Sequence, residues 1–142
     1  MAETTLFVDT GAWYALADKS DGFHTKAVQV YPDLLRRYRY LTTTNLVVAE
    51  TYTLMLRSLG HDPARKFLHN LGASPRIVKI YSDKVLEQRA EKILEEYEDQ
   101  NFSYTDAVSF GVMNKYGIRL AFAFDQHFAT AGFTLVPEIS GL

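Results

Sequence analysis

Short apolar runs alternate along the chain with longer segments in which apolar residues recur every three or four positions. Short runs are typical of buried strands and the longer pattern of amphipathic helices, so their alternation indicates β-α-β units around a parallel sheet. The pattern predicts five strands, at Thr5–Val8, Tyr40–Thr42, Ile77–Ile80, Ile118–Phe124 and Thr134–Val136. It predicts six helices, at Ala12–Ala17, His24–Arg37, Leu46–Leu59, Pro63–Leu71, Asp83–Tyr97 and Tyr104–Tyr116.

The order of these elements predicts a single α/β domain over residues 1–142. The sequence has no internal repeat, low-complexity segment or long linker that would divide it. We therefore expect a three-layer α/β/α sandwich around a parallel β-sheet. Ligands of such sheets bind outside the carboxyl ends of the strands, which makes the residues at those ends the first candidates for a site.

Composition excludes several classes of protein. The 142 residues contain no cysteine, which rules out a disulfide framework, a cysteine zinc site and a thiol nucleophile, and favours a reducing compartment. No stretch approaches the ~18 consecutive apolar residues of a membrane span, and no basic flank precedes the first apolar run. We expect a cytoplasmic protein that does not bind membranes.

The net charge of −2 gives little support for a nucleic-acid partner, but the charge is unevenly distributed. The segment from Gly22 to Ile80 contains nine basic and three acidic residues, and much of the remaining negative charge lies between Glu87 and Asp99. The acidic segment is typical of a solvated helix face. The basic surplus could contact a phosphate backbone.

Two aspartates stand at predicted strand ends. Asp9 directly follows Leu6–Val8, and Asp125 directly follows Leu120–Phe124. Each could simply cap the next helix or turn, because aspartate is among the preferred capping residues. Their matching positions would also place both at the carboxyl edge of a parallel sheet.

Glu50 lies on what the helical period makes an apolar face. Leu46 precedes it by four residues and Leu54 follows by four, which predicts that its carboxylate projects from the apolar side of the helix. A charge there needs a compensating partner or a metal ion. A salt bridge to Arg57 or Arg36 is the structural alternative.

Asp106 has the same kind of environment. Phe102 precedes it by four residues and Phe110 follows by four on the same predicted helix face. Ser103 and Asp106 also have the spacing of a capping box, which would put Asp106 in the first turn of the helix. The two roles do not exclude each other.

Taken together, these four carboxylates are better explained by convergence on one site than by four unrelated roles. Clustered carboxylates repel one another, and hard divalent cations that prefer oxygen ligands are a natural way to keep them ionised. The histidines are scattered, and only one, His127, lies near a candidate acid, two residues after Asp125.

Four motifs carry a resemblance to a known family: VDTGAW at the first strand end, TTNLVVAET on the third predicted helix, SYTDAVSF, and FAFDQHF. In this order and spacing, from Phe7 to Val136, the chain resembles a PIN domain of the VapC toxin type. The resemblance implies the α/β/α fold and Mg²⁺- or Mn²⁺-dependent cleavage of single-stranded RNA. It also implies a homodimer and, for toxins, inhibition by a cognate antitoxin.

The resemblance also assigns residues. The acidic positions of the family fall on Asp9, Glu50, Asp106 and Asp125, as metal ligands and catalytic residues. Positions that would hydrogen-bond the metal ligands or the substrate fall on Thr10, Asn45, Ser103 and Thr105.

Three alternatives remain open from the sequence alone. The chain could be a catalytically silent PIN-fold module that binds RNA or protein, or a PIN-type nuclease that acts on structured DNA. A phosphoryl transferase with Asp9 as nucleophile is weaker, because the haloacid dehalogenase pattern has a second aspartate where this chain has Gly11.

Overall fold

A five-stranded parallel sheet forms the centre of the structure, a computed structural model that describes residues 4–138. The strands follow the order β3-β2-β1-β4-β5. Their bounds are β1 (Thr5–Val8), β2 (Tyr40–Thr44), β3 (Ile77–Ile80), β4 (Leu120–Phe122) and β5 (Thr134–Val136). Every neighbouring pair is parallel, as the alternating pattern predicts.

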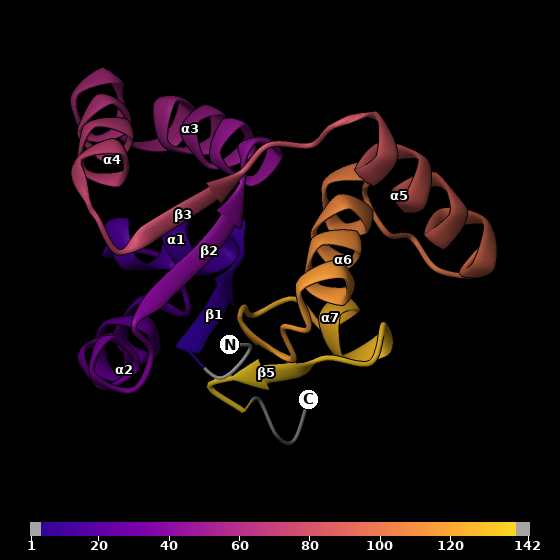
Figure 1. The fold of residues 1–142 in the computed structure, drawn as a ribbon. Helices are drawn as coiled ribbons and strands as arrows, with labels where there is room; N and C mark the ends of the chain where they lie inside the picture. The colour runs from indigo at the N-terminus through magenta and orange to yellow at the C-terminus, as the bar shows by residue number, and fades with distance from the viewer. Residues whose placement is uncertain (1–3, 139–142) are drawn as a thin grey trace.

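Helices flank the sheet on both sides, which confirms the predicted α/β/α architecture. Figure 1 shows α2 and α4 on one side of the strands and α5 and α6 on the other. The helices are α1 (Thr10–Ala17), α2 (His24–Arg37), α3 (Asn45–Leu59), α4 (His61–Ala73), α5 (Lys84–Glu96), α6 (Tyr104–Tyr116) and α7 (His127–Thr130). Within residues 4–138 none of them is both long and apolar enough to cross a membrane.

The central strand β1 explains why the sheet forms where it does. Its residues Leu6, Phe7 and Val8 are completely buried, because parallel strands of such sheets are covered on both faces. The ring of Phe128 lies 6.1 Å from that of Phe7 and 4.9 Å from that of Phe110 on α6. These aromatic contacts hold α6 and α7 against the strands that carry the candidate site.

Several helix ends differ by one or two residues from the sequence prediction, and two strands and one short helix differ for reasons that the sheet explains. Strand β4 is shorter than predicted, because its neighbour β1 ends at Val8, opposite Phe122, and leaves no partner beyond it. Strand β2 continues to Thr44, because it pairs with β3 up to the residues Thr44 and Ile80. The short helix α7 was not predicted, since four residues are too few for a helical period.

The two edges of the sheet differ in charge. Arg39 and Arg76 immediately precede β2 and β3, so they lie at the amino edge, opposite the edge where Asp9 and Asp125 follow their strands. The Arg76 guanidinium donates hydrogen bonds to the carbonyls of Leu35, Tyr38 and Arg39, and so holds the end of α2. Part of the basic surplus between residues 22 and 80 therefore stabilises the fold at a distance from the acidic residues.

Candidate metal centre at the carboxyl edge of the sheet

Asp9 links the ends of the neighbouring strands β1 and β4, and its carboxylate has no capping role. Its backbone N–H donates to the carbonyl of Phe122 at 3.1 Å. The residue stands at the N-cap position of α1, but its side chain makes no capping hydrogen bond. The simple capping explanation is therefore wrong for the Asp9 carboxylate, which is only 5% exposed.

The environment of Asp9 strongly disfavours a negative charge. Its pKa is raised from 3.8 to about 8, first by burial and then by repulsion from Asp106, with smaller contributions from Asp125 and Glu50. A hydrogen bond from the backbone of Thr10 acts in the opposite direction. Four carboxylates from separate parts of the chain thus lie within electrostatic range of one another, as the sequence suggested.

Asp106 occupies the first turn of α6 and forms the predicted capping box. Its N–H donates to Ser103 Oγ at 2.9 Å, and the N–H of Ser103 donates back to Asp106 Oδ2 at 3.2 Å. The residue is 7% exposed and lines the same cavity as Asp9. The helix cap and the acidic cluster therefore share this side chain.

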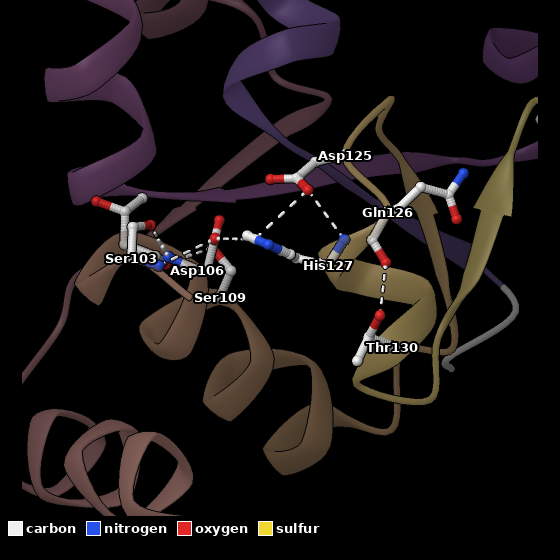
Figure 2. A network of polar contacts seen from close by, with 8 residues as sticks. Ser103, Asp106, Ser109, Asp125, Gln126, His127 and Thr130 are labelled. Atoms are coloured by element: carbon white, nitrogen blue, oxygen red, sulfur yellow. Dashed lines mark hydrogen bonds and ion pairs between the residues drawn. The ribbon is translucent and has the colours of Figure 1, made fainter. Parts of the chain in front are cut away.

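Asp125 and His127 lie beside Asp106 in the segment after β4 (Figure 2). The N–H of His127 donates to Asp125 Oδ1 at 2.9 Å. Its ring nitrogen Nδ1 lies 3.2 Å from Asp106 Oδ2 and 3.5 Å from Asp125 Oδ1. One potential ligand atom from each of the three residues falls within 4.8 Å of the others, which is close enough to share a metal ion.

Glu50 reaches the cavity from the solvent side, which contradicts the prediction that it lies on a core-facing surface. The core side of α3 is formed by Val47, Val48, Thr51 and Met55, whereas Glu50 is exposed and Leu54 is 36% exposed. Leu46, Glu50 and Leu54 instead border a surface groove beside the acidic cluster. No basic side chain within residues 4–138 forms an ion pair with Glu50, so the salt-bridge alternative is also wrong.

An open cavity of about 370 Å³ brings most of the candidates together. It is lined by Asp9, Thr10, Gly11, Glu50, Asn101, Ser103, Asp106, Asp125 and His127. Thr10 Oγ1 is buried there and makes no hydrogen bond, alone among the buried side-chain nitrogen and oxygen atoms of residues 4–138. A buried hydroxyl without a partner is costly, and its position suits a ligand in the cavity.

Two predicted hydrogen-bonding residues lie elsewhere. Asn45, which is the first residue of α3 and does not precede it, accepts a hydrogen bond from the N–H of Ser82 at 2.8 Å and so fixes the loop after β3. Thr105 lines the neighbouring groove together with Glu50.

Two cavity residues were not assigned from the sequence. The sequence places His127 near the site, two residues after Asp125, but assigns it no role. Asn101 had no such signal, because it lies in an irregular segment before α6.

The donor set fits a hard divalent cation. Carboxylate oxygens are the preferred ligands of Mg²⁺ and Mn²⁺, and a bound cation would offset the repulsion that raises the pKa of Asp9. Asp9, Asp106 and Asp125 could supply these oxygens directly, with Glu50 at the open side.

Comparisons with a family model and with known proteins all indicate the same family. The PIN domain family matches residues 6–134. The chain is 36% identical over 135 residues to the 23S rRNA-specific endonuclease VapC20 of Mycobacterium tuberculosis, covering 94% of this chain and 99% of that protein. It is 29% identical to a VapC ribonuclease of Archaeoglobus fulgidus over 124 residues, covering 86% of this chain and 78% of that protein.

A solved structure agrees with these sequence matches. The crystal structure of Mycobacterium tuberculosis VapC20, described as a sarcin-ricin loop cleaving toxin, superposes with a TM-score of 0.84 at 33% sequence identity. The match covers 91% of this chain and 96% of that chain.

Proposed function

Because the chain belongs to the PIN-domain family and to its VapC type, we propose that it is a divalent-metal-dependent endoribonuclease that cleaves single-stranded RNA. We further propose that it is the toxin of a type II toxin-antitoxin pair. The observation that carries the proposal is the convergence of Asp9, Glu50, Asp106 and Asp125 on one open cavity.

The four carboxylates would hold one or two Mg²⁺ or Mn²⁺ ions, which supply an activated water and neutralise charge on the phosphate. Asp9 and Asp106 are the buried members and would fix the position of the ion. The capping box keeps Asp106 in one orientation through Ser103. The unpartnered hydroxyl of Thr10 is available to hydrogen-bond a ligand or a phosphate oxygen.

The substrate would continue from the cavity into the groove on α3. That groove has a volume of about 450 Å³ and is lined by Leu46, Ala49, Glu50, Thr53, Leu54, Arg57 and Thr105. Arg57 is exposed two turns along the helix from Glu50, where its charge can contact an RNA phosphate. Arg39 and Arg76 lie at the opposite edge of the sheet, so we do not assign them to this segment of RNA.

The first substrates to test are an unstructured RNA and a transcript of the 23S rRNA loop on which the Mycobacterium tuberculosis relative is named to act. We expect cleavage of at least one of them with Mg²⁺ or Mn²⁺, and none with EDTA. Asp9→Asn should abolish cleavage, because it removes the most buried charge of the metal site. Asp62→Asn is the matched control, since Asp62 is an exposed acid on α4 that pairs with Arg65.

Equal activity in the wild-type and Asp9→Asn preparations would identify a contaminating nuclease and contradict the proposal. Cleavage of a flap or junction DNA in preference to both RNAs would favour a structure-specific DNA nuclease. RNA binding with neither metal binding nor cleavage would favour a silent PIN-fold module.

The proposed partners are an antitoxin protein and a second copy of this chain. An antitoxin segment that covers the acidic cavity should carry an arginine, because its planar guanidinium matches paired carboxylates. Co-expression with the product of a neighbouring short reading frame should relieve growth arrest and co-purify with the chain. A monomeric mass at micromolar concentration in sedimentation experiments would contradict the homodimer.

Residues 1–142 are proposed to form one domain. The protein is proposed to act in the cytoplasm, where its RNA substrate is present.

A further inference from the structure

His127 contacts two carboxylates of the proposed metal centre, those of Asp106 and Asp125. Its Nδ1 atom lies 3.2 Å from Asp106 Oδ2 and 3.5 Å from Asp125 Oδ1 (Figure 2). Asp106 belongs to the first turn of α6 and Asp125 to the segment after β4, and no hydrogen bond within residues 4–138 joins them directly. The imidazole is therefore the bridge between two acids that would otherwise repel each other.

The contacts of His127 leave one oxygen of each carboxylate free. Asp106 Oδ2 accepts from the N–H of Ser103 and faces Nδ1 of the ring, and Asp125 Oδ1 accepts from the backbone N–H of His127. Within residues 4–138, Asp106 Oδ1 and Asp125 Oδ2 take part in no hydrogen bond or ion pair. These two oxygens are therefore available to a metal ion.

The ring itself is fixed in place. It packs edge-to-face with the ring of Phe102, with ring centroids 5.1 Å apart and planes at 65°. Its backbone is held by the hydrogen bond to Asp125 at the start of α7. A side chain held at two points can hold its neighbours in turn, whereas a freely rotating one could not.

We propose that His127 is a positioning residue that donates Nδ1–H to Asp106, stays close to Asp125, and orients both carboxylates toward one divalent cation. This role requires an N–H at Nδ1, which both the Nδ1-protonated neutral ring and the cation supply. Hydrogen-bond partners of metal ligands typically contribute 10–100-fold to metal affinity. The inference rests on the proposed function, because it assumes that the acidic cluster binds a divalent cation.

Two substitutions in the full chain distinguish the effect of the N–H donor from the effect of the aromatic ring. His127→Phe keeps the aromatic contact with Phe102 and removes the donor, and His127→Asn keeps an N–H donor near the Nδ1 position and removes the ring. Mn²⁺ affinity is measured by the loss of the free-ion EPR signal on titration with protein. His69→Ala is the control, because His69 is exposed on α4.

We expect His127→Phe to weaken Mn²⁺ binding by about 10–100-fold. His127→Asn should bind nearly as tightly as wild type, and His69→Ala should be unchanged. Circular dichroism checks folding, and His127→Ala replaces the Phe variant if that variant does not fold. Wild-type affinity in a folded variant without the donor would overturn the proposal, even if its melting temperature were lower.

Three other outcomes have different meanings. Nitrogen hyperfine coupling to bound Mn²⁺ in pulsed EPR of the wild type, absent in His127→Phe, would make His127 a direct ligand and overturn the positioning role. Mn²⁺ binding with neither this coupling nor any difference among the variants would overturn it while leaving the proposed function intact. Failure of the wild type to bind Mn²⁺ or Mg²⁺ would instead contradict the proposed function itself.

Discussion

The raised pKa of Asp9 predicts that the acidic cluster destabilises the metal-free protein as the pH rises. In the unfolded chain this carboxyl ionises near pH 3.8, whereas in the folded protein it keeps its proton to about pH 8. Between these values the folded state binds more protons than the unfolded state, so the free energy of unfolding falls with increasing pH. Asp9→Asn removes the titrating group and should remove most of this decline.

The magnitude follows from the difference between the two pKa values. At about 1.4 kcal/mol per pKa unit, the shift from 3.8 to about 8 corresponds to a loss of about 6 kcal/mol between pH 4 and pH 8. This is an upper limit, because relaxation and water entry reduce the cost of a buried charge. We expect metal-free Asp9→Asn to be more stable than the metal-free wild type at pH 8 by ~2 kcal/mol or more.

Urea unfolding followed by far-UV circular dichroism, in EDTA at pH 5, 6, 7 and 8, measures this difference. The wild type should lose stability steadily across the series, and Asp9→Asn should change much less. Saturating Mn²⁺ at pH 8 should stabilise the wild type and have little effect on Asp9→Asn. Asp62→Asn controls for the removal of an exposed carboxylate.

Equal pH slopes for the wild type and Asp9→Asn would refute the reasoning, because the slope would then come from other groups. Lower stability of Asp9→Asn at pH 8 would also refute it. That result would mean that the Asp9 carboxylate contributes stabilising interactions even without a cation.

Three other changes have expected outcomes. Arg57→Ala should weaken RNA binding and lower the salt dependence of log Kd by about one ion, as measured by fluorescence anisotropy, while Arg39→Ala at the amino edge should not. Arg76→Ala should cost about 2 kcal/mol in urea unfolding, because three carbonyls at the end of α2 lose a charged donor, and should leave Mn²⁺ affinity unchanged. Phe110→Ala should cost about 3–5 kcal/mol in the same assay, because the ring is 1% exposed and packs against three other phenylalanines, Phe102, Phe128 and Phe133.

Most of the fold could be predicted because its central elements have strong local patterns. The apolar run Leu6–Val8 identified strand β1, and the 3.6-residue periods identified the long helices. The ends of the strands depend on their neighbours and so could not be predicted locally. Strand β4 ends where β1 ends, a fact that the apolar run up to Phe124 does not contain.

The candidate site could be predicted less completely, for a similar reason. Asp9 and Asp106 were found because a carboxylate within an apolar pattern is conspicuous. The orientation of Glu50 was wrong because α3 has apolar residues on two sides, and only packing decides which side is buried. The position of His127 between Asp106 and Asp125 depends on the short turn between β4 and α7, and hydrophobic periodicity cannot predict the geometry of such a turn.

The pairing of β4 with β1 has a consequence for the protein while it is being synthesised. Asp9 and Glu50 are synthesised early, whereas Asp125 follows β4, which pairs with β1 across more than 100 residues. A partly made chain therefore lacks a complete metal site. Hydrolytic activity should therefore require residues made near the end of synthesis, so the ribosomes that translate the chain work beside an inactive polypeptide for most of that time.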